Sequence, residues 1–487
     1  MADDYAALRR QLLDIRARDD DVILRSISLP PDSIPCIVAF LDGIVNKDLL
    51  HTQVLSPILQ PEPYCVDDPL PDTRDRLLRR FLCVSEVKEV SDCAAIEREL
   101  YTGAIVVICA GMRGAILLRL DGFMRRSPGA PLNDRTISGP RDSFTESLPG
   151  NIGLVRKKLA DPRLRVKKTV IGRRTRTNIA LLYMDDIALP DTVREVEHRL
   201  SAIDIDGILA SGYIAQLTEA PGTSIFPTYR EIERPDIAVA ALLEGRVVVI
   251  CDPSPLVLSF PTVFAELLQA AEDYYEKPVA GTFARLLRWV CFFLAVSLPA
   301  LYVSLVSFRP EILPYDLLVT IASLRSQVPF PVIWETLFIE FAVQAIIESS
   351  LRLPEPLGQT IGVVSGIIVG QAIISASLAT PMVLIVVALA NICTFCIPSF
   401  SLSVTVRILR LCMLFPAATF GIFGFSLAWM FLLVHMQSLN SMGVPYLAPF
   451  SPHIPSDHKD AALRAPLQRF IRRPRSIGNR NLRRQRP

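Results

Sequence analysis

The feature that most constrains this chain is a run of 51 residues, Pro356 to Val406, without one Asp, Glu, Lys or Arg. An α-helix rises about 1.5 Å per residue, so about 20 apolar residues cross the hydrocarbon core of a bilayer. The run is long enough to cross twice, and its glycines and Pro381 mark where it can turn. We therefore expect an integral membrane protein.

Charge divides the chain into three parts. Residues 1–288 carry 36 basic and 41 acidic residues, residues 289–456 carry five and six, and residues 457–487 carry ten and two. This predicts a soluble part large enough for one large or two small cores, then a membrane domain, then a basic tail. The first 21 residues are charged and lack the apolar segment of a secretory signal, so we expect the soluble part and both chain ends in the cytoplasm. There the ten cysteines should stay reduced, without a disulfide framework.

Hydrophobic patterning predicts that the soluble part is α/β or α+β, with two small subdomains. A charged N-terminal segment, 1–32, is expected to be a helix with a connector, followed by subdomain 1 at 33–125 and subdomain 2 at 132–278. Helices are expected from Leu189-Pro190 onward and over 260–277, leading to the membrane. Short apolar runs predict buried strands at 35–40, 104–109, 115–120, 177–185 and 246–251.

The membrane domain, 285–436, is expected to be all-α and polytopic, with the basic tail at 437–487. If both ends are cytoplasmic, the number of crossings must be even, which leaves Arg407 and Arg410 outside or else buried against protein. Residues 328–351 are apolar but carry three carboxylates, and we expect an amphipathic or re-entrant helix there. A fifth crossing by residues 328–351 would make the number of crossings odd, unless residues 402–436 also cross twice. Spans are expected at about 289–308, 359–377, 381–399 and 411–436.

Three glycines, Gly362, Gly366 and Gly370, recur every four residues and so lie on one helical stripe. Small residues at this spacing let helices approach closely, so tight helix packing is one interpretation. The other is a helix beside a conducting axis, where apolar residues gate by dewetting. The candidate pore-lining or gating residues are Gly362, Val363, Gly366, Ile367, Gly370 and Gln371.

The acidic residues Glu335, Glu340 and Glu348 precede this helix, with Arg352 as a local partner. Acidic rings attract cations, which would suit a cation path. The alternative is a set of solvated charges on a surface helix. The pair Cys393 and Cys396 has redox-motif spacing, but its apolar surroundings favour packing.

Signals of catalysis are weak. The chain has five histidines and no HExxH, phosphate-loop or GxSxG motif, so we expect no enzyme, cofactor, metal or nucleic-acid partner. The arginine-rich tail either binds anionic lipid headgroups or is a disordered topology signal, and we favour the second interpretation.

Six stretches carry a family resemblance. They are the sequence GPRDSFTES with NI and R after it, FP with ERPD, DYY with PALYV, PFP with Glu335, RLP with the later GQA, and GVPY. In order and spacing they resemble the A subunit of nutrient germinant receptors, in the GerA family of spore germination proteins. The signature residues of the first two are Gly139, Pro140, Arg141, Phe144, Glu146, Asn151, Arg156, Glu233, Arg234, Pro235 and Asp236.

Two places depart from the family pattern. Pro149-Gly150 stand where polar helix formers are usual, and Ser349-Ser350 replace the usual Glu-Ala before Arg352. The second change removes an acidic group and weakens any detailed charge-ring interpretation.

The resemblance implies a non-catalytic subunit in the spore inner membrane, assembled with a permease-like B subunit and a lipoprotein C subunit. It implies a homo-oligomer, with a pentamer as one arrangement, around a path for monovalent cations. Nutrient binding would then shift a closed-to-open equilibrium. The alternative is a non-conducting scaffold or signalling subunit that assembles the receptor. A secondary transporter fits less well, because no inverted repeat is evident.

Overall fold

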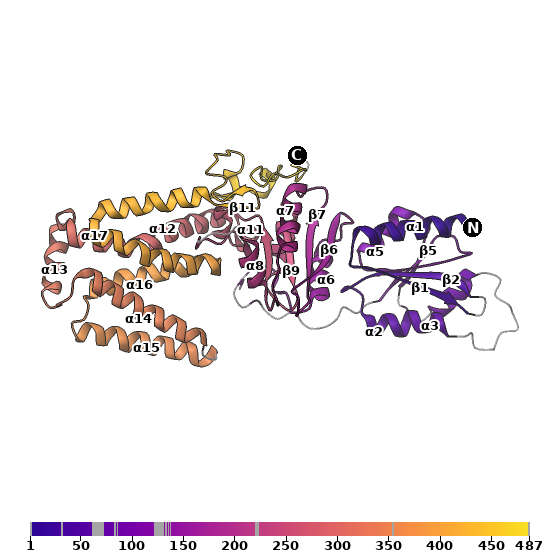
Figure 1. Cartoon of the computed structure of the whole chain (residues 1–487), viewed down its shortest axis with the longest axis horizontal. Helices are drawn as coiled ribbons and strands as arrows, with labels where there is room; N and C mark the ends of the chain where they lie inside the picture. Colours follow the sequence, from indigo (N-terminus) through magenta and orange to yellow (C-terminus); the bar gives the residue numbers. More distant parts are fainter. Residues whose placement is uncertain are drawn as a thin grey trace.

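The computed structural model describes residues 2–30, 33–60, 73–81, 84, 86–120, 131, 134, 136, 138–219, 224–352 and 355–485. Figure 1 shows an elongated molecule with two sheet-containing subdomains at one end and a helical bundle at the other. The expected soluble part of mixed helices and strands and the all-α bundle are therefore confirmed, and the soluble part is of the α+β kind because the described strand pairs are antiparallel.

Subdomain 1 is an antiparallel sheet of five strands in the order β1-β2-β4-β5-β3. Alternate residues of each strand face opposite sides, so both faces of the sheet carry a core. Leu12 and Ile15 cover one face, and Val54 and Phe81 cover the other. The strands are Val22–Leu29, Ile34–Leu41, Glu86–Val90, Ile105–Cys109 and Ala115–Arg119. The helices are α1 Ala2–Arg18, α2 Lys47–Leu50, the π-helix His51–Leu55, α3 Ser56–Leu59, α4 Thr73–Arg80 and α5 Cys93–Tyr101.

Subdomain 2 repeats this topology with the order β6-β7-β9-β10-β8, again antiparallel. Each subdomain begins with a helix and a strand pair, inserts helices, and ends with a strand, a helix and two strands. The strands are Leu164–Ile171, Thr177–Met184, Arg230–Ile232, Val247–Cys251 and Val257–Phe260. The helices are α6 Leu148–Lys158, α7 Pro190–Ser201, α8 Ser211–Thr218 and α9 Pro235–Leu243. The chain thus contains a structural duplication that its sequence did not indicate.

Two predicted elements of the soluble part are wrong. The connector expected before residue 30 is strand β1, which pairs with β2 along its whole length. The helix expected over 260–277 is instead the end of β10, the short helices α10 Phe264–Leu267 and α11 Glu272–Tyr275, and the connections between them. Residues 126–131, between the two predicted subdomains, lie almost wholly outside the described residues.

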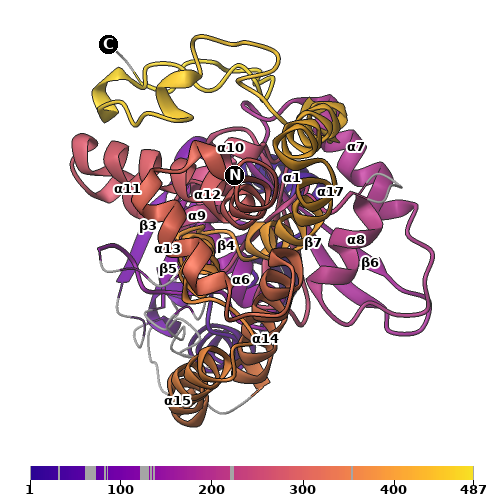
Figure 2. The same ribbon diagram turned by 90° about the vertical axis from the view of Figure 1, so that its left-hand side faces the viewer.

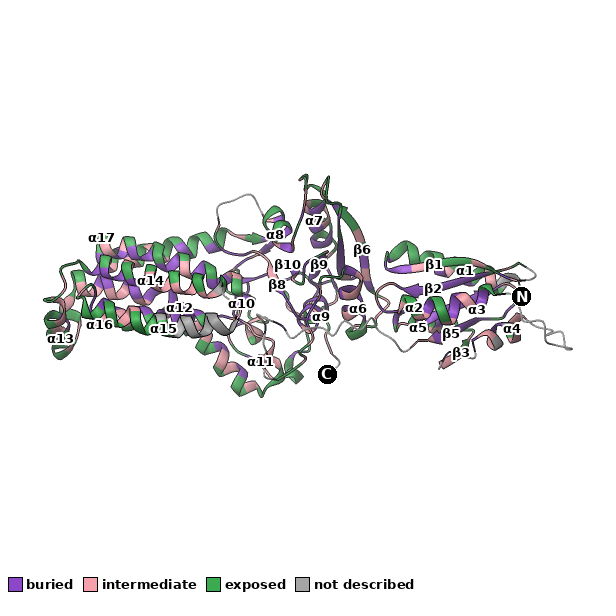
Figure 3. Ribbon diagram, turned by 90° about the horizontal axis from the view of Figure 1, so that it is seen from below, coloured by how far each residue is buried: buried purple, intermediate pink, exposed green. Residues whose placement is uncertain are grey.

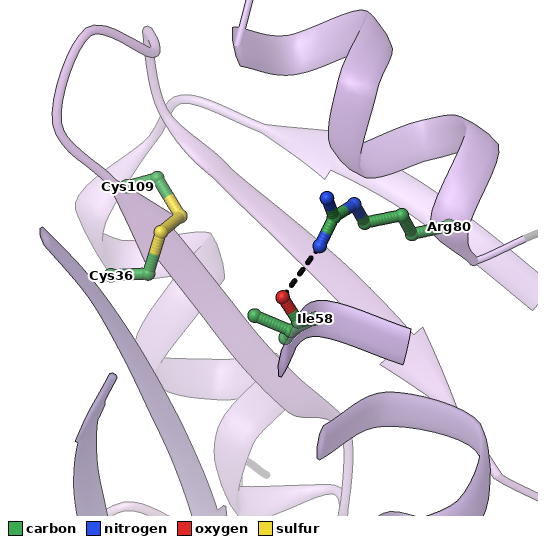
Figure 4. Close-up of a disulfide and its surroundings, with 4 residues drawn as sticks. All are labelled: Cys36, Ile58, Arg80 and Cys109. Atoms are coloured by element: carbon green, nitrogen blue, oxygen red, sulfur yellow. Dashed lines mark hydrogen bonds between the residues drawn. A yellow bond between two sulfur atoms is a disulfide. The ribbon is translucent and has the colours of Figure 1, made fainter. Parts of the chain in front are cut away.

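The expectation of reduced thiols throughout is also wrong. Cys36 of β2 and Cys109 of β4 stand directly opposite each other and form a disulfide (Figure 4). Beside it, Arg80 donates a hydrogen bond of 2.5 Å to the Ile58 carbonyl. Sequence spacing could not reveal this pair, because 73 residues separate its members and only strand register brings them together.

The bundle consists of α12 Pro278–Phe308, α13 Tyr315–Arg325, α14 Val332–Arg352, α15 Glu355–Ser375, α16 Pro381–Phe395 and α17 Phe400–Ser438. Among the described residues, α12 and α17 are the helices that have the length and hydropathy for a membrane crossing. Residues 328–351 were expected to be amphipathic or re-entrant. The structure has a helix there: α14 is one continuous helix of 21 residues that runs along the bundle (Figure 1).

The segment α17 is a helical hairpin, because Gly421 leaves the helical conformation with φ 61° and ψ −140°. Its first arm meets subdomain 2 through Thr405, whose hydroxyl donates to the Ile225 carbonyl at 2.6 Å. Its second arm returns there, with His435 at 3.0 Å from Ser224. The span expected at 411–436 is thus broken by a turn. With α12, α14, α15 and α16, the two arms make six helices along the bundle, which is the even number that the parity condition requires if each of them crosses the membrane.

The basic tail is ordered rather than a loose topology signal. After the hairpin of β11 Asn440–Ser441 and β12 Val444–Pro445, the tail returns over subdomain 2. The Arg473 side chain donates to the Leu243 carbonyl at 2.6 Å, and the Arg480 amide donates to the Ile187 carbonyl at 2.9 Å. These contacts hold the last part of the chain against the soluble subdomains.

Candidate functional site

The predicted pore helix α15 lies at the outer edge of the bundle. Viewed along the bundle, α12 is near the centre and α15 is the outermost helix, beside α14 (Figure 2). Ile367 is 62% exposed and the next residue, Ile368, is 61% exposed. Exposed green residues follow the outside of the bundle in Figure 3. An apolar helix with this exposure has an unoccupied face within the single chain.

The glycine stripe makes no tight packing contact inside this chain where the structure describes it. A Cβ placed on Gly366 would meet nothing within 4 Å, and one on Gly370 would meet Leu384 at an ordinary 3.8 Å. Gln371 is exposed. Gly362 and Val363 lie in α15, but their side chains are outside the described part. The stripe is therefore available to another molecule.

The three carboxylates expected as one acidic patch are separated. Glu348 is exposed and pairs with Arg352 at 2.7 Å. Glu335 is 1% exposed and accepts a hydrogen bond of 3.1 Å from the Thr380 amide. Thr380 is the N-cap of α16, where the helix dipole favours a negative charge.

Glu340 instead faces a buried arginine. Its carboxylate lies 3.0 Å from Nε of Arg410, on the first arm of α17. Nη2 of Arg410 also donates to Oδ1 of Asn391 on α16, at 2.8 Å. A charge-assisted cluster thus joins three helices inside the bundle. The sequence indicated that Arg410 might be buried against protein, but no sequence signal pointed to Asn391.

A second charge cluster attaches the soluble part to the bundle. Asp273 accepts hydrogen bonds of 2.9 Å from Arg285 and 2.8 Å from Arg288, both in the first turns of α12. Arg285 continues to Asp460 of the tail at 2.8 Å, and Tyr274 donates to the same carboxylate at 2.8 Å. Burial is the main cause that raises the pKa of Tyr274 above its usual value. Subdomain 2, α12 and the tail are therefore held at one point.

The ERPD signature lies next to this junction. Arg234 is 1% exposed and donates to both carboxylate oxygens of Asp236 through Nε and Nη2, at 3.0 and 2.6 Å. The Tyr275 hydroxyl also donates to Asp236, and burial with this hydrogen bond raises the pKa of Tyr275 to about 12. Gly139 must be small here, because a Cβ on it would approach the Tyr275 ring to 2.8 Å. Pro235 is the buried first residue of α9.

The remaining signature residues have structural partners or face outward. Phe144 is buried, and its amide donates to the Glu233 carbonyl at 2.8 Å. Asn151 closes the start of α6 by accepting from the Thr145 amide at 2.8 Å. Pro140 is half-buried, while Arg141 and Glu146 are exposed.

Arg156 joins the two subdomains. Its guanidinium donates to Asp21 at 2.9 and 3.0 Å, with both side chains 0% exposed. It also lies over the Tyr101 ring, 4.8 Å from the centroid. Tyr101 donates to the neighbouring Asp19, whose pKa is raised mainly by burial.

A cavity of about 240 Å³ lies between the ERPD segment and the connection from α16 to α17. Its wall includes Arg230, Arg234, Arg288 and Glu231. Each is already paired: Arg230 with Glu266 at 3.1 Å, and Glu231 with Ser401 at 2.9 Å, for example. Among the described residues, no group of His, Cys, Asp and Glu has the arrangement of a metal site.

Comparison with known proteins identifies the family to which this chain belongs. The family model described as Bacillus/Clostridium GerA spore germination protein matches residues 10–476. This chain belongs to the GerA family. Spore germination protein GerLA of Bacillus cereus is 34% identical over 465 residues, which cover 96% of this chain and 94% of that protein. Spore germination protein KA of Bacillus subtilis is 35% identical over 460 residues, which cover 94% of this chain and 84% of that protein.

Two further matches complete the comparison of this GerA-family chain. An uncharacterized membrane protein of Bacillus subtilis, YfkQ, is 35% identical over 437 residues, covering 90% and 84% of the two chains. The crystal structure of the N-terminal domain of the A subunit of the Bacillus megaterium spore germinant receptor GerK3 matches at 25% identity. It covers 53% of this chain and 93% of that domain, with a TM-score of 0.40. The family match and the apolar helices agree on membrane association.

Proposed function

We propose that this chain is the A subunit of a nutrient germinant receptor in the spore inner membrane. It converts nutrient binding into ion release as one subunit of an oligomeric, ligand-gated ion channel. The relatives named spore germination proteins support the germination role. Its partners are a permease-like B subunit, a lipoprotein C subunit and monovalent cations, and both chain ends are cytoplasmic.

The observation that carries the channel proposal is the unoccupied face of α15. Ile367 is 62% exposed, and a Cβ on Gly366 would meet nothing within 4 Å among the described residues. Copies of α15 arranged around an axis would line it with small and apolar side chains. Such a lining can close a path by excluding water, without a bulky plug.

For the soluble part to control this helix, a bound nutrient must have different affinities for the closed and open states of the receptor. A ligand shifts a closed-to-open equilibrium only when it binds the two states unequally. The Asp273 cluster is the physical connection available, because it joins subdomain 2, the start of α12 and the tail.

Replacing Ile367 or Val363 by Ala tests the lining. We expect leaky or premature germination, because a narrower apolar side chain weakens the dewetted barrier. Ile385→Ala is the matched control, since Ile385 is 60% exposed on the neighbouring helix α16. Tightly regulated germination in both α15 variants, at wild-type protein level, would contradict a lining role.

A scaffold that assembles the receptor without conducting is the competing function. The same α15 face favours it too, because an exposed apolar helix also serves as a contact for other membrane subunits. Ion flux through the purified chain in sealed vesicles separates the two. Flux supports the channel, and its absence in the complete receptor supports the scaffold.

A further inference from the structure

We propose that Glu340 and Arg410 are positioning residues that set where α15 rests, and so hold the proposed path closed without nutrient. This inference rests on the proposed channel function. It concerns groups that do not line the exposed face of α15: their side chains are 4% and 1% exposed, inside the bundle.

The pair connects the hairpin of α14 and α15 to a helix that is bound to subdomain 2. α14 and α15 form a hairpin at the bundle edge (Figure 2), with α14 between α15 and the other helices. Arg410 belongs to the first arm of α17, which is bound to subdomain 2 through Ser401 and Thr405. Asn391 is fixed by its own bond to the Val387 carbonyl, at 2.9 Å. A shift at Glu340 therefore moves α14, and α15 with it.

The cluster is charged but incompletely bonded. Nε of Arg410 and Oε1 of Glu340 are close enough for an ion pair, yet they are not aligned as a hydrogen bond, and Nη1 of Arg410 has no partner among the described residues. Buried polar groups normally have at least one hydrogen-bond partner, so a helix position that bonds these atoms would gain the free energy that the present one lacks. This cluster can therefore exchange one helix position for another, as a two-state element requires.

Basal ion release is the measurement that tests the inference. Spores carry the full receptor with Glu340→Gln or Arg410→Gln, and cation release is recorded without added nutrient, with protein level by immunoblot. We expect release about 5- to 150-fold faster than wild type, the usual range of coupling between sites. The charge-swapped double variant, Glu340→Arg with Arg410→Glu, should return release toward wild type. Glu311→Gln is the control, since it breaks an exposed ion pair with Arg309 at 3.2 Å.

Wild-type release from both single variants at normal abundance overturns the inference. If the single variants do not accumulate, Arg410→Lys takes their place, because it keeps the charge but lacks the planar fork that reaches Glu340 and Asn391 together. Cation release at the wild-type rate from Arg410→Lys spores would likewise contradict the positioning role.

A second readout separates this inference from the channel itself. In Ile367→Cys chains, the rate of maleimide labelling reports the exposure of α15, and Glu340→Gln should change that rate. If Glu340→Gln changes neither the labelling rate nor the cation release, while the wild-type receptor conducts ions, the positioning role alone is contradicted. If the wild-type receptor conducts no ions, the proposed channel function is contradicted instead.

Discussion

At the scale of single residues, buried charges connect the parts of this molecule. Arg156 is a signature residue that the sequence marked without a role, and the structure makes it a fully buried ionic link between the subdomains. Its partner Asp21 lies in a run of three aspartates at the end of the charged first 21 residues. Pairing at a distance of 135 residues cannot be read from composition or periodicity.

Replacing Asp21 by Asn should destabilise the contact between the subdomains by up to about 3–5 kcal/mol, because the buried Arg156 would lose its hydrogen-bonded carboxylate and keep only the more distant Asp19, at 4.0 Å. Hydrogen exchange of α6 and β1 amides in the full chain measures this. Asp204→Asn removes a carboxylate from an exposed pair with Arg173, and it should change little. Unchanged protection of α6 in Asp21→Asn would contradict the assigned role of Arg156.

At the scale of elements, the sequence predicted central strands well and irregular joints poorly. The apolar runs at 104–109 and 177–185 were recognisable because both of their faces are buried. The edge strand β1 was missed, since its central residues are polar or half-exposed. The hairpin in α17 was considered from the sequence only as an alternative, because its turn lies within an apolar run without polar turn residues.

Gly421 should be the least replaceable residue of the hairpin. A side chain there would need φ 61° with ψ −140°, and its Cβ would approach the Phe308 ring to 2.9 Å. Gly421→Ala is therefore expected to lower the thermal midpoint of the detergent-solubilised chain. Gly366→Ala is the matched change in a helix without a neighbour, and it should leave the midpoint near wild type. Equal midpoints for the two variants would argue against the turn.

The structural duplication makes a prediction about cysteines. Cys109 ends β4 opposite Cys36, and Cys251 ends β9 opposite Ile179. The following amides, of Ala110 and Asp252, even make equivalent bonds at 3.0 Å to the strand opposite. Replacing Ile179 by Cys should therefore create a second cross-strand disulfide, detected as a linked peptide by mass spectrometry. Leu181→Cys, opposite Val249, should remain a free thiol.

At the scale of the whole molecule, the α17 hairpin decides where the tail lies. A single span over 411–436 would leave an odd number of passages and place the tail at the far end, beyond α13. With two arms, the tail returns to subdomain 2, where Asp460 reaches Arg285. The sequence stated the parity condition, but only the turn at Gly421 shows how the chain meets it.

Labelling of single cysteines from each side of sealed vesicles tests this topology. In chains whose exposed Cys93 and Cys412 are replaced by Ser, an impermeant maleimide should reach Tyr315→Cys, at the far end, from one side only. Leu467→Cys in the tail and Asp204→Cys in subdomain 2 should react only from the other side, because six passages return the chain to its starting face. If the tail position shared its reactive side with Tyr315→Cys, the number of crossings would be odd, and the hairpin could not be a pair of membrane passages.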